Sequence, residues 1–174
     1  ALRQGAGIHL HMSETQLEHR ECIERHGMTP CAWFDSLGVF EAPTNAAHCV
    51  WVSDEDMALM AAKGVSASLN PASNGKLASG FAPAAKLVAA GVNCGIGTDG
   101  MASNNTHNIL QSAYLLAVSQ KGAELDPTVL TPKEILSMIT VNGARAQGRP
   151  DCGVMACGMR ADLVVLDVDK PWMR

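Results

Sequence analysis

The sequence has few aromatic residues, no basic excess and no long apolar run, and each shortage excludes a class of protein. Aromatic side chains make up only 4% of the 174 residues, too few for the base-stacking surfaces of proteins that bind single-stranded nucleic acid. Lys and Arg number 13 against 17 Asp and Glu, and the net charge of −4 argues against nucleic acid or an anionic membrane as partner. No apolar stretch approaches the roughly 18 residues of a membrane span.

The six cysteines lack the paired spacing of a metal or redox motif. None forms a C-x-x-C pair, which excludes a zinc ribbon and a thioredoxin-type site. Cys49 and Cys94 lie in apolar, strand-like runs, where cysteine behaves as a small hydrophobic residue. The sequence shows no basic and apolar leader, so we expect reduced thiols in a cytoplasmic protein.

Apolar residues are present in ordinary amount. They make up 47% of the chain, enough to form a buried core. The sequence opens on Ala1 without a methionine and stops abruptly after Pro171-Trp172-Met173-Arg174. Neither end resembles a natural terminus, so we expect a fragment of a longer protein.

Strand and helix patterns alternate along the chain. Short apolar runs predict strands over 7–12, 45–52, 65–69 and 92–96. Amphipathic or capped segments predict helices over 15–26, 30–37, from Ser53 to Gly64, and over 82–90 and 105–121. Four successive β-α units indicate parallel strands covered by helices, in either a doubly wound sheet or a (β/α) barrel.

Two polar loops, one more helix and one more strand are also predicted. Residues 70–80 and the stretch after Gly97-Thr98-Asp99-Gly100 are polar and are expected to be loops. Thr131-Pro132-Lys133-Glu134 is a strong helix start, and the helix is expected to run to about residue 142. One more strand is predicted over 161–167.

Polar residues recur where the predicted strands end. His11 and Glu14 lie at the end of the first strand, His48 in the second, Asn70 after the third and Asp99 after the fourth. One such residue alone would be an ordinary packing or turn residue. Their recurrence in successive units favours a barrel, because barrel enzymes build their sites around the carboxyl ends of all the strands.

The types of these residues suit a hydrolytic metal centre. Histidine and aspartate are ligands of zinc and similar divalent ions. Such an ion lowers the pKa of a bound water to near 7. A neighbouring glutamate can transfer protons, and a histidine can stabilise the attacking hydroxide.

A glycine motif in the fourth unit matches the pattern of a dinucleotide-binding loop. Gly95-Ile96-Gly97-Thr98-Asp99-Gly100 matches G-x-G-x-x-G and follows a strand. A dinucleotide site needs a helix N-terminus there to hold the pyrophosphate, but a carboxylate stands in this loop and the next predicted helix begins several residues later. Nucleotide binding by this loop is not expected.

Several motifs together resemble the amidohydrolase superfamily, most closely its 5-methylthioadenosine/S-adenosylhomocysteine deaminases, alongside the triazine hydrolases. They are His11-Met12-Ser13-Glu14-Thr15, Ala47-His48-Cys49, Asn70-Pro71-Ala72-Ser73-Asn74, Lys76-Leu77-Ala78-Ser79-Gly80, and the segment from Gly97 to Asn105. The resemblance covers nearly the whole chain. It implies a (β/α)8 TIM-type barrel, with strands five to eight in residues 1–150 and a partial return to a small β-sandwich domain in 151–174.

The resemblance also implies roles for individual residues. His11 is then a metal ligand, and Glu14 is the catalytic acid that protonates a purine ring nitrogen and contacts the substrate. His48 orients the attacking water. Asp99 contacts the metal and the substrate and acts as the base, and Ser103 lies on the substrate side. The implied cofactor is one divalent metal ion, with zinc as first choice and iron or manganese as alternatives.

The implied reaction is hydrolytic deamination of 5-methylthioadenosine or S-adenosylhomocysteine to the inosine analogue and ammonia. The expected partner is therefore a small purine nucleoside, and neither a nucleic acid nor a membrane is expected to bind. The resemblance also suggests a homo-oligomer. Other amidohydrolase substrates, guanine or an s-triazine, are the alternative, and a catalytically inactive half-barrel is the alternative of another class.

Two departures from the family stand out. The H-x-H metal ligands of the first barrel strand are missing, since His9-Leu10-His11 leads directly into the Ser-Glu-Thr context of the fifth strand. Activity is therefore expected to require the N-terminal half of the barrel. Leu69 and Gly75 also stand where the family often has His and Leu, which bears on substrate recognition.

Overall fold

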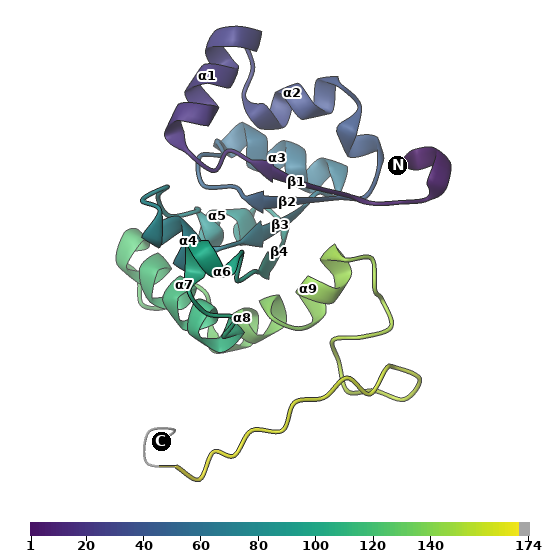
Figure 1. The fold of residues 1–174 in the computed structure, drawn as a ribbon, viewed down its shortest axis with the longest axis vertical. Helices are drawn as coiled ribbons and strands as arrows, with labels where there is room; N and C mark the ends of the chain where they lie inside the picture. Colours follow the sequence, from purple (N-terminus) through teal and green to yellow (C-terminus); the bar gives the residue numbers. More distant parts are fainter. Residues whose placement is uncertain (171–174) are drawn as a thin grey trace.

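Four parallel strands form one sheet in the computed structural model, which describes residues 1–170 (Figure 1). Their order in the sheet follows the chain: β1 (Ile8–Met12), β2 (Thr44–His48), β3 (Ser66–Leu69) and β4 (Asn93–Ile96). The four strands confirm the predicted parallel α/β arrangement, although β2 ends at His48, four residues earlier than expected. The sheet therefore brings all four strand ends to one edge.

Helices connect the strands. In chain order they are the short 3-10 helix η1 (Leu2–Gln4), α1 (Gln16–His26), α2 (Pro30–Ser36), η2 (Val39–Glu41), α3 (Asp54–Lys63), α4 (Pro71–Lys76), α5 (Ala84–Ala89), α6 (Met101–Asn104), α7 (Ile109–Glu124), α8 (Pro132–Met138) and α9 (Val141–Ala146). The predicted N-caps Ser53 and Thr131 both form capping boxes, and Gly64 ends α3 in the left-handed conformation.

The two faces of the sheet differ in chemistry because side chains alternate along each strand. One face carries the buried core residues Met12, Ala46, Ala67, Leu69, Cys94 and Ile96, which cluster with Met60 of α3 and Leu87 of α5. The other face carries a polar row that crosses all four strands in register: His9, Asn45, Ser66 and Asn93. A polar face on a parallel sheet suits the interior of a barrel that contains polar groups.

Helix α9 covers the β4 end of the polar face. The Asn142 side chain donates to the Cys94 carbonyl at 3.1 Å, and the Asn142 carbonyl accepts from Asn93 Nδ2 at 3.1 Å. Gly95 and Gly143 meet without side chains, since a Cβ on Gly95 would lie 3.4 Å from Gly143 Cα. Figure 1 accordingly shows α8 and α9 on the opposite side of the sheet from α1, α2 and α3.

Three helix predictions need correction. The predicted loop 70–80 contains α4, which begins with a proline at its first position. The helix predicted over 105–121 corresponds to α7, which starts only at Ile109 because Asn108 caps it, and the stretch before it, expected to be a loop, contains α6, which ends where Asn105 adopts a left-handed backbone (φ 72°). The helix expected to reach residue 142 is divided into α8 and α9.

The strand predicted over 161–167 is not formed. Residues 161–169 are extended and carry exposed apolar side chains, Val164 and Val165 above all at 84% and 94% exposure. A strand needs a neighbour to pair with, and within residues 1–170 this segment has none in the sheet. The second domain expected over 151–174 stays a prediction, and its last residues, 171–174, lie outside the described residues.

Within residues 1–170, no helix combines the length and apolar character needed to cross a membrane. All six cysteine thiols are free, and burial raises the pKa of Cys94 to about 12, so that thiol stays protonated at neutral pH.

Candidate active site

The carboxyl ends of the strands carry an unusual backbone. Ser13 after β1, His48 and Cys49 at the end of β2, and Asp99 after β4 all have positive φ angles, between 50° and 74°. A residue with a Cβ in this region costs about 1–2 kcal/mol relative to ordinary backbone. Such strain clusters at functional sites, and here it turns the chain sharply at the edge where the predicted site residues lie.

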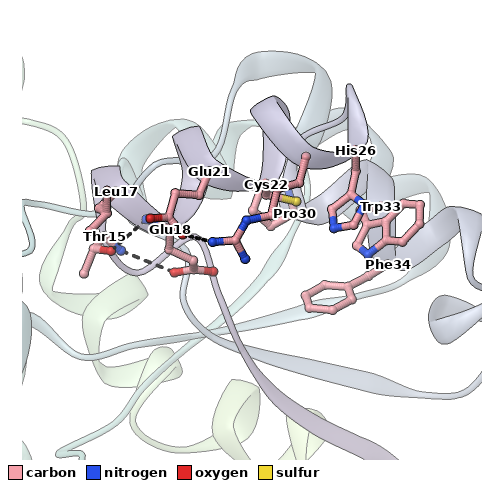
Figure 2. Close-up of a pocket in the computed structure, with 10 residues that line it drawn as sticks. Thr15, Leu17, Glu18, Glu21, Cys22, His26, Pro30, Trp33 and Phe34 are labelled. Carbon is pink, nitrogen blue, oxygen red and sulfur yellow. Dashed lines mark hydrogen bonds and ion pairs between the residues drawn. The ribbon is translucent and has the colours of Figure 1, made fainter.

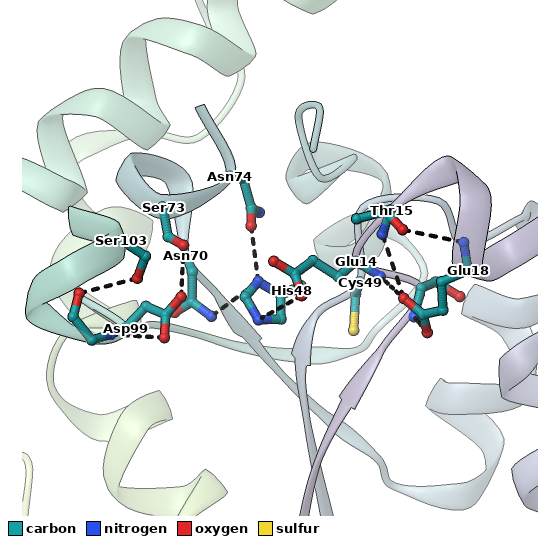
Figure 3. A network of polar contacts seen from close by, with 12 residues as sticks. Glu14, Thr15, Glu18, His48, Cys49, Asn70, Ser73, Asn74, Asp99 and Ser103 are labelled. Atoms are coloured by element: carbon teal, nitrogen blue, oxygen red, sulfur yellow. Dashed lines mark hydrogen bonds and ion pairs between the residues drawn. The ribbon is translucent and has the colours of Figure 1, made fainter. Parts of the chain in front are cut away.

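Three of the predicted residues lie together at the ends of β1 and β2, and Figure 3 shows two of them, Glu14 and His48. His48 Nε2 is 3.7 Å from Glu14 Oε2, and the His48 side chain is only 2% exposed. The His11 ring stacks on the His48 ring, with centroids 5.3 Å apart and planes 20° from parallel. The structure therefore brings together a metal-ligand candidate, an acid and a histidine.

Asn74 of α4 binds one nitrogen of the His48 ring. His48 Nδ1 lies 2.8 Å from Asn74 Oδ1, an acceptor, so Nδ1 donates this hydrogen bond and Nε2 faces Glu14. Asn70 Nδ2 lies farther from the same nitrogen, at 3.5 Å. Asn74 is 1% exposed, so this hydrogen bond is shielded from water.

Asp99 is held as an ionised carboxylate. Its Oδ2 accepts from Ser73 Oγ at 2.6 Å and its Oδ1 from the Gly100 N–H at 2.7 Å. Burial raises the pKa of Asp99, but the hydrogen bonds from Ser73, Gly100 and Ser103 lower it and together outweigh burial. The pKa therefore lies below its ordinary value, and the group is charged at neutral pH.

Two of the residues in this network were assigned no role from the sequence. Ser73 and Asn74 lie in the stretch 70–80 that was predicted to be a loop, yet α4 turns both inward, and both are at least 99% buried. The dipeptide Asn70-Pro71 is the feature of the sequence that could have indicated helix α4, because a proline after a polar residue often occupies the first position of a helix. The predicted residue Ser103 lies beside Asp99, and its hydroxyl donates to the Gly100 carbonyl at 3.0 Å.

Gly97 provides space that the network needs. A Cβ at this position would lie 2.3 Å from Asn70 Oδ1 and 3.1 Å from Ser68 Oγ. Replacing Gly97 with Ala is therefore expected to displace Asn70 and to lower the free energy of unfolding by about 1–3 kcal/mol, measured by urea unfolding.

Gly122→Ala is the matched control for this prediction. Gly122 lies within α7, and a Cβ there would meet nothing within 4 Å. This change is expected to raise stability by about 0.5–1 kcal/mol, because alanine favours a helix interior. Equal effects of the two substitutions would contradict the steric role of Gly97.

Within residues 1–170, the side chains that suit a metal ion make up only part of a ligand set. His11 offers an imidazole and Asp99 an ionised carboxylate, both of which zinc accepts. No group of three or more His, Cys, Asp or Glu in residues 1–170 is placed to hold an ion. A catalytic zinc normally takes three protein ligands, so the two residues fit as part of a ligand set.

A groove between α1 and α2 is separate from this site (Figure 2). Its lining includes His26, whose ring stacks on Trp33 at a centroid distance of 4.0 Å. None of the predicted site residues lines it, although Thr15 and Glu18 at its edge also belong to the network of Figure 3.

The amino-acid sequence of the chain is similar to those of known enzymes. The model of the amidohydrolase family matches residues 1–172. A 5-methylthioadenosine/S-adenosylhomocysteine deaminase of Dictyoglomus thermophilum is 43% identical over 98% of the chain, and so is a 5'-deoxyadenosine deaminase of Methanosarcina mazei. The chain spans about two fifths of the length of these relatives, 40% and 39%.

Solved structures give a matching result. An adenosine deaminase from Xanthomonas campestris with bound zinc superimposes on the whole chain with a TM-score of 0.95 and 36% identity, and the chain covers 40% of it. An atrazine chlorohydrolase from Arthrobacter aurescens, in complex with zinc, has a TM-score of 0.85 and 30% identity over 92% of the chain, which covers 36% of it.

Proposed function

Because the chain belongs to the amidohydrolase family, we propose that it supplies strands five to eight of a (β/α)8 barrel in a metal-dependent nucleoside deaminase. The proposed substrates are adenosine-type thioether nucleosides, 5-methylthioadenosine and S-adenosylhomocysteine, and the products are the inosine analogue and ammonia. The observation that carries the proposal is the 3.7 Å approach of Glu14 to His48 at the strand ends. The relatives named as deaminases support the choice of substrate.

The proposed reaction divides proton transfer between two carboxyl groups. Glu14 donates a proton to the ring nitrogen next to the amine-bearing carbon, which makes that carbon more electrophilic. Asp99 accepts a proton from the attacking water and passes it to the departing amine, which leaves as ammonia. Glu14 then recovers its proton from the new hydroxyl group, so the purine ends as the keto form and the enzyme is unchanged.

His48 orients the water in this scheme. Its Nδ1 proton is committed to Asn74, so the lone pair on Nε2 can accept a hydrogen bond from the water. The stacked His11 ring and the Asp99 carboxylate would hold a divalent ion together with ligands from outside this chain. A zinc, iron or manganese ion there would lower the pKa of water toward neutrality.

The chain by itself is expected to bind zinc weakly and to be inactive. It contributes two of the metal donors, whereas a catalytic zinc site normally has three protein ligands. Dialysis of residues 1–174 against micromolar zinc, followed by metal analysis, should find well under one ion per chain. A full-length protein treated in the same way is the control, and stoichiometric zinc in the chain alone would contradict the divided site.

A substrate panel tests the proposed function. The full-length protein that carries this chain is expected to release ammonia from 5-methylthioadenosine and S-adenosylhomocysteine, and to leave guanine and atrazine unchanged. Triazine hydrolysis is the alternative that the similarity to atrazine chlorohydrolase favours. Turnover of atrazine without deamination of any nucleoside would replace the proposal with that alternative.

A further inference from the structure

The carboxylate of Glu18 binds three successive backbone N–H groups in the loop that carries Glu14 (Figure 3). Glu18 Oε1 accepts from the Ser13 N–H at 2.9 Å, and Oε2 accepts from the Glu14 N–H at 2.7 Å and the Thr15 N–H at 3.4 Å. All three donors lie between the metal-ligand candidate His11 and the start of α1. Glu18 therefore binds the backbone of the segment from which the proposed acid projects.

Helix capping explains only the weakest of these three contacts. In the capping box of α1, Thr15 accepts from the Glu18 N–H and Glu18 accepts from the Thr15 N–H. The equivalent residue of α8, Glu134, binds only the N–H and hydroxyl groups of its own cap residue, Thr131. The two shorter bonds of Glu18, to Ser13 and Glu14, reach upstream of the cap and have no counterpart in α8.

The same loop is held from its other side by the segment that follows His48. The Ser13 carbonyl accepts from the N–H groups of Val50 and Trp51, each at 3.0 Å. Ser13 itself is fully buried and has a φ of 50°, a conformation that its neighbours must maintain. The bonds from Glu18 and from residues 50–51 together fix the backbone before Glu14 relative to the end of β2.

We propose that Glu18 is a positioning residue that sets the Glu14 carboxyl group against Nε2 of His48. This inference rests on the proposed function, in which Glu14 transfers the proton. Without the Glu18 carboxylate, the backbone at Ser13 and Glu14 loses two strong hydrogen bonds, and the Glu14 side chain shifts while the metal donors His11 and Asp99 remain. The expected consequence is a loss in kcat at nearly constant KM.

Two substitutions in the full-length protein test this role. Glu18→Ala is expected to lower kcat for 5-methylthioadenosine about 10- to 100-fold, the loss that follows a displacement of about 1 Å at a catalytic group. KM and zinc content should stay within about twofold of the unmodified protein. Glu18→Gln keeps one acceptor oxygen, so its kcat is expected to lie between that of Glu18→Ala and that of the unmodified protein. This variant also provides a folded protein if Glu18→Ala is unstable.

Glu134→Ala is the matched control, because it removes a capping box of the same type on another helix, α8. It is expected to lower stability by about 0.5–2 kcal/mol, as loss of a cap does, and to leave kcat unchanged. If the Glu18 variants lower stability to the same extent and likewise leave kcat unchanged, Glu18 is a cap residue only and the proposal fails.

Hydrogen exchange separates this proposal from the proposed function. The amides of Ser13 and Glu14 should exchange faster in Glu18→Gln than in the unmodified protein or in Glu134→Ala. If the unmodified protein deaminates none of the nucleosides, the proposed function fails, and the exchange rates still decide whether Glu18 holds the loop. Unchanged exchange at both amides would overturn the inference whatever the activity.

Discussion

Replacement of Asp99 with alanine is expected to lower kcat/KM for nucleoside deamination by more than about 10³-fold in the full-length protein. The substitution removes a proposed metal donor and the proposed base together, and the loss of one proton-transfer group alone costs about 10²–10⁴-fold. The carboxylate is ionised and is held in place by hydrogen bonds from Ser73 and Gly100, which alanine cannot accept. Ammonia release from 5-methylthioadenosine measures the effect.

Asp126 supplies the control for this substitution. Its carboxylate also lies in a loop and accepts hydrogen bonds from the N–H and hydroxyl groups of Thr128, but this loop follows α7 and does not follow a strand. Asp126→Ala is expected to leave kcat/KM unchanged. Turnover by Asp99→Ala within tenfold of the unmodified protein would refute the assignment of Asp99.

The second large effect is expected for Glu14→Gln. Glutamine has the shape of glutamate and can keep the contact with His48, but it cannot donate and recover a proton at neutral pH. We therefore expect kcat to fall about 10²–10⁴-fold, with zinc content unchanged because Glu14 is not a proposed ligand. Steady-state kinetics and metal analysis of the same preparation measure both quantities.

Glu21→Gln provides the comparison on the neighbouring helix. Glu21 pairs with Arg25 on the surface of α1, and its substitution removes one carboxylate without touching the strand ends. Its kcat is expected to match that of the unmodified protein. A Glu14→Gln variant that is equally active would show that the acid is another group.

Much of the fold followed from the sequence because its signals are local. The four parallel strands are short apolar runs, and the helix over 53–64 carries clear end signals, the caps Ser53 and Gly64. The strand over 161–167 has the same apolar pattern but forms no ladder, because pairing depends on a neighbour and not on the segment itself.

The candidate site was predictable in part for similar reasons. His11, Glu14, His48 and Asp99 are conspicuous at the ends of strands, and the structure brings His11 and Glu14 to His48. The residues that orient them were not predictable. Helix α4 has six residues, too few to show a helical period, so Ser73 and Asn74 gave no sign that they face inward.

The contacts of Glu18 could not be predicted from the sequence for a different reason. Its spacing from Thr15 is that of any capping box, and only the three-dimensional path of the loop shows that the same carboxylate reaches Ser13 and Glu14. The sequence pattern therefore predicts the cap and says nothing of the two stronger hydrogen bonds.

Three of the side chains that arrange Glu14, His48 and Asp99 come from the same stretch of chain as the residues they hold. Asn74 holds His48, Ser73 holds Asp99, and Glu18 holds the backbone of Glu14, each from within residues 13–100. Genetic recombination between related barrels can therefore exchange this stretch without breaking any of those bonds. The residues proposed to transfer protons can then be inherited as a single module together with the side chains that hold them.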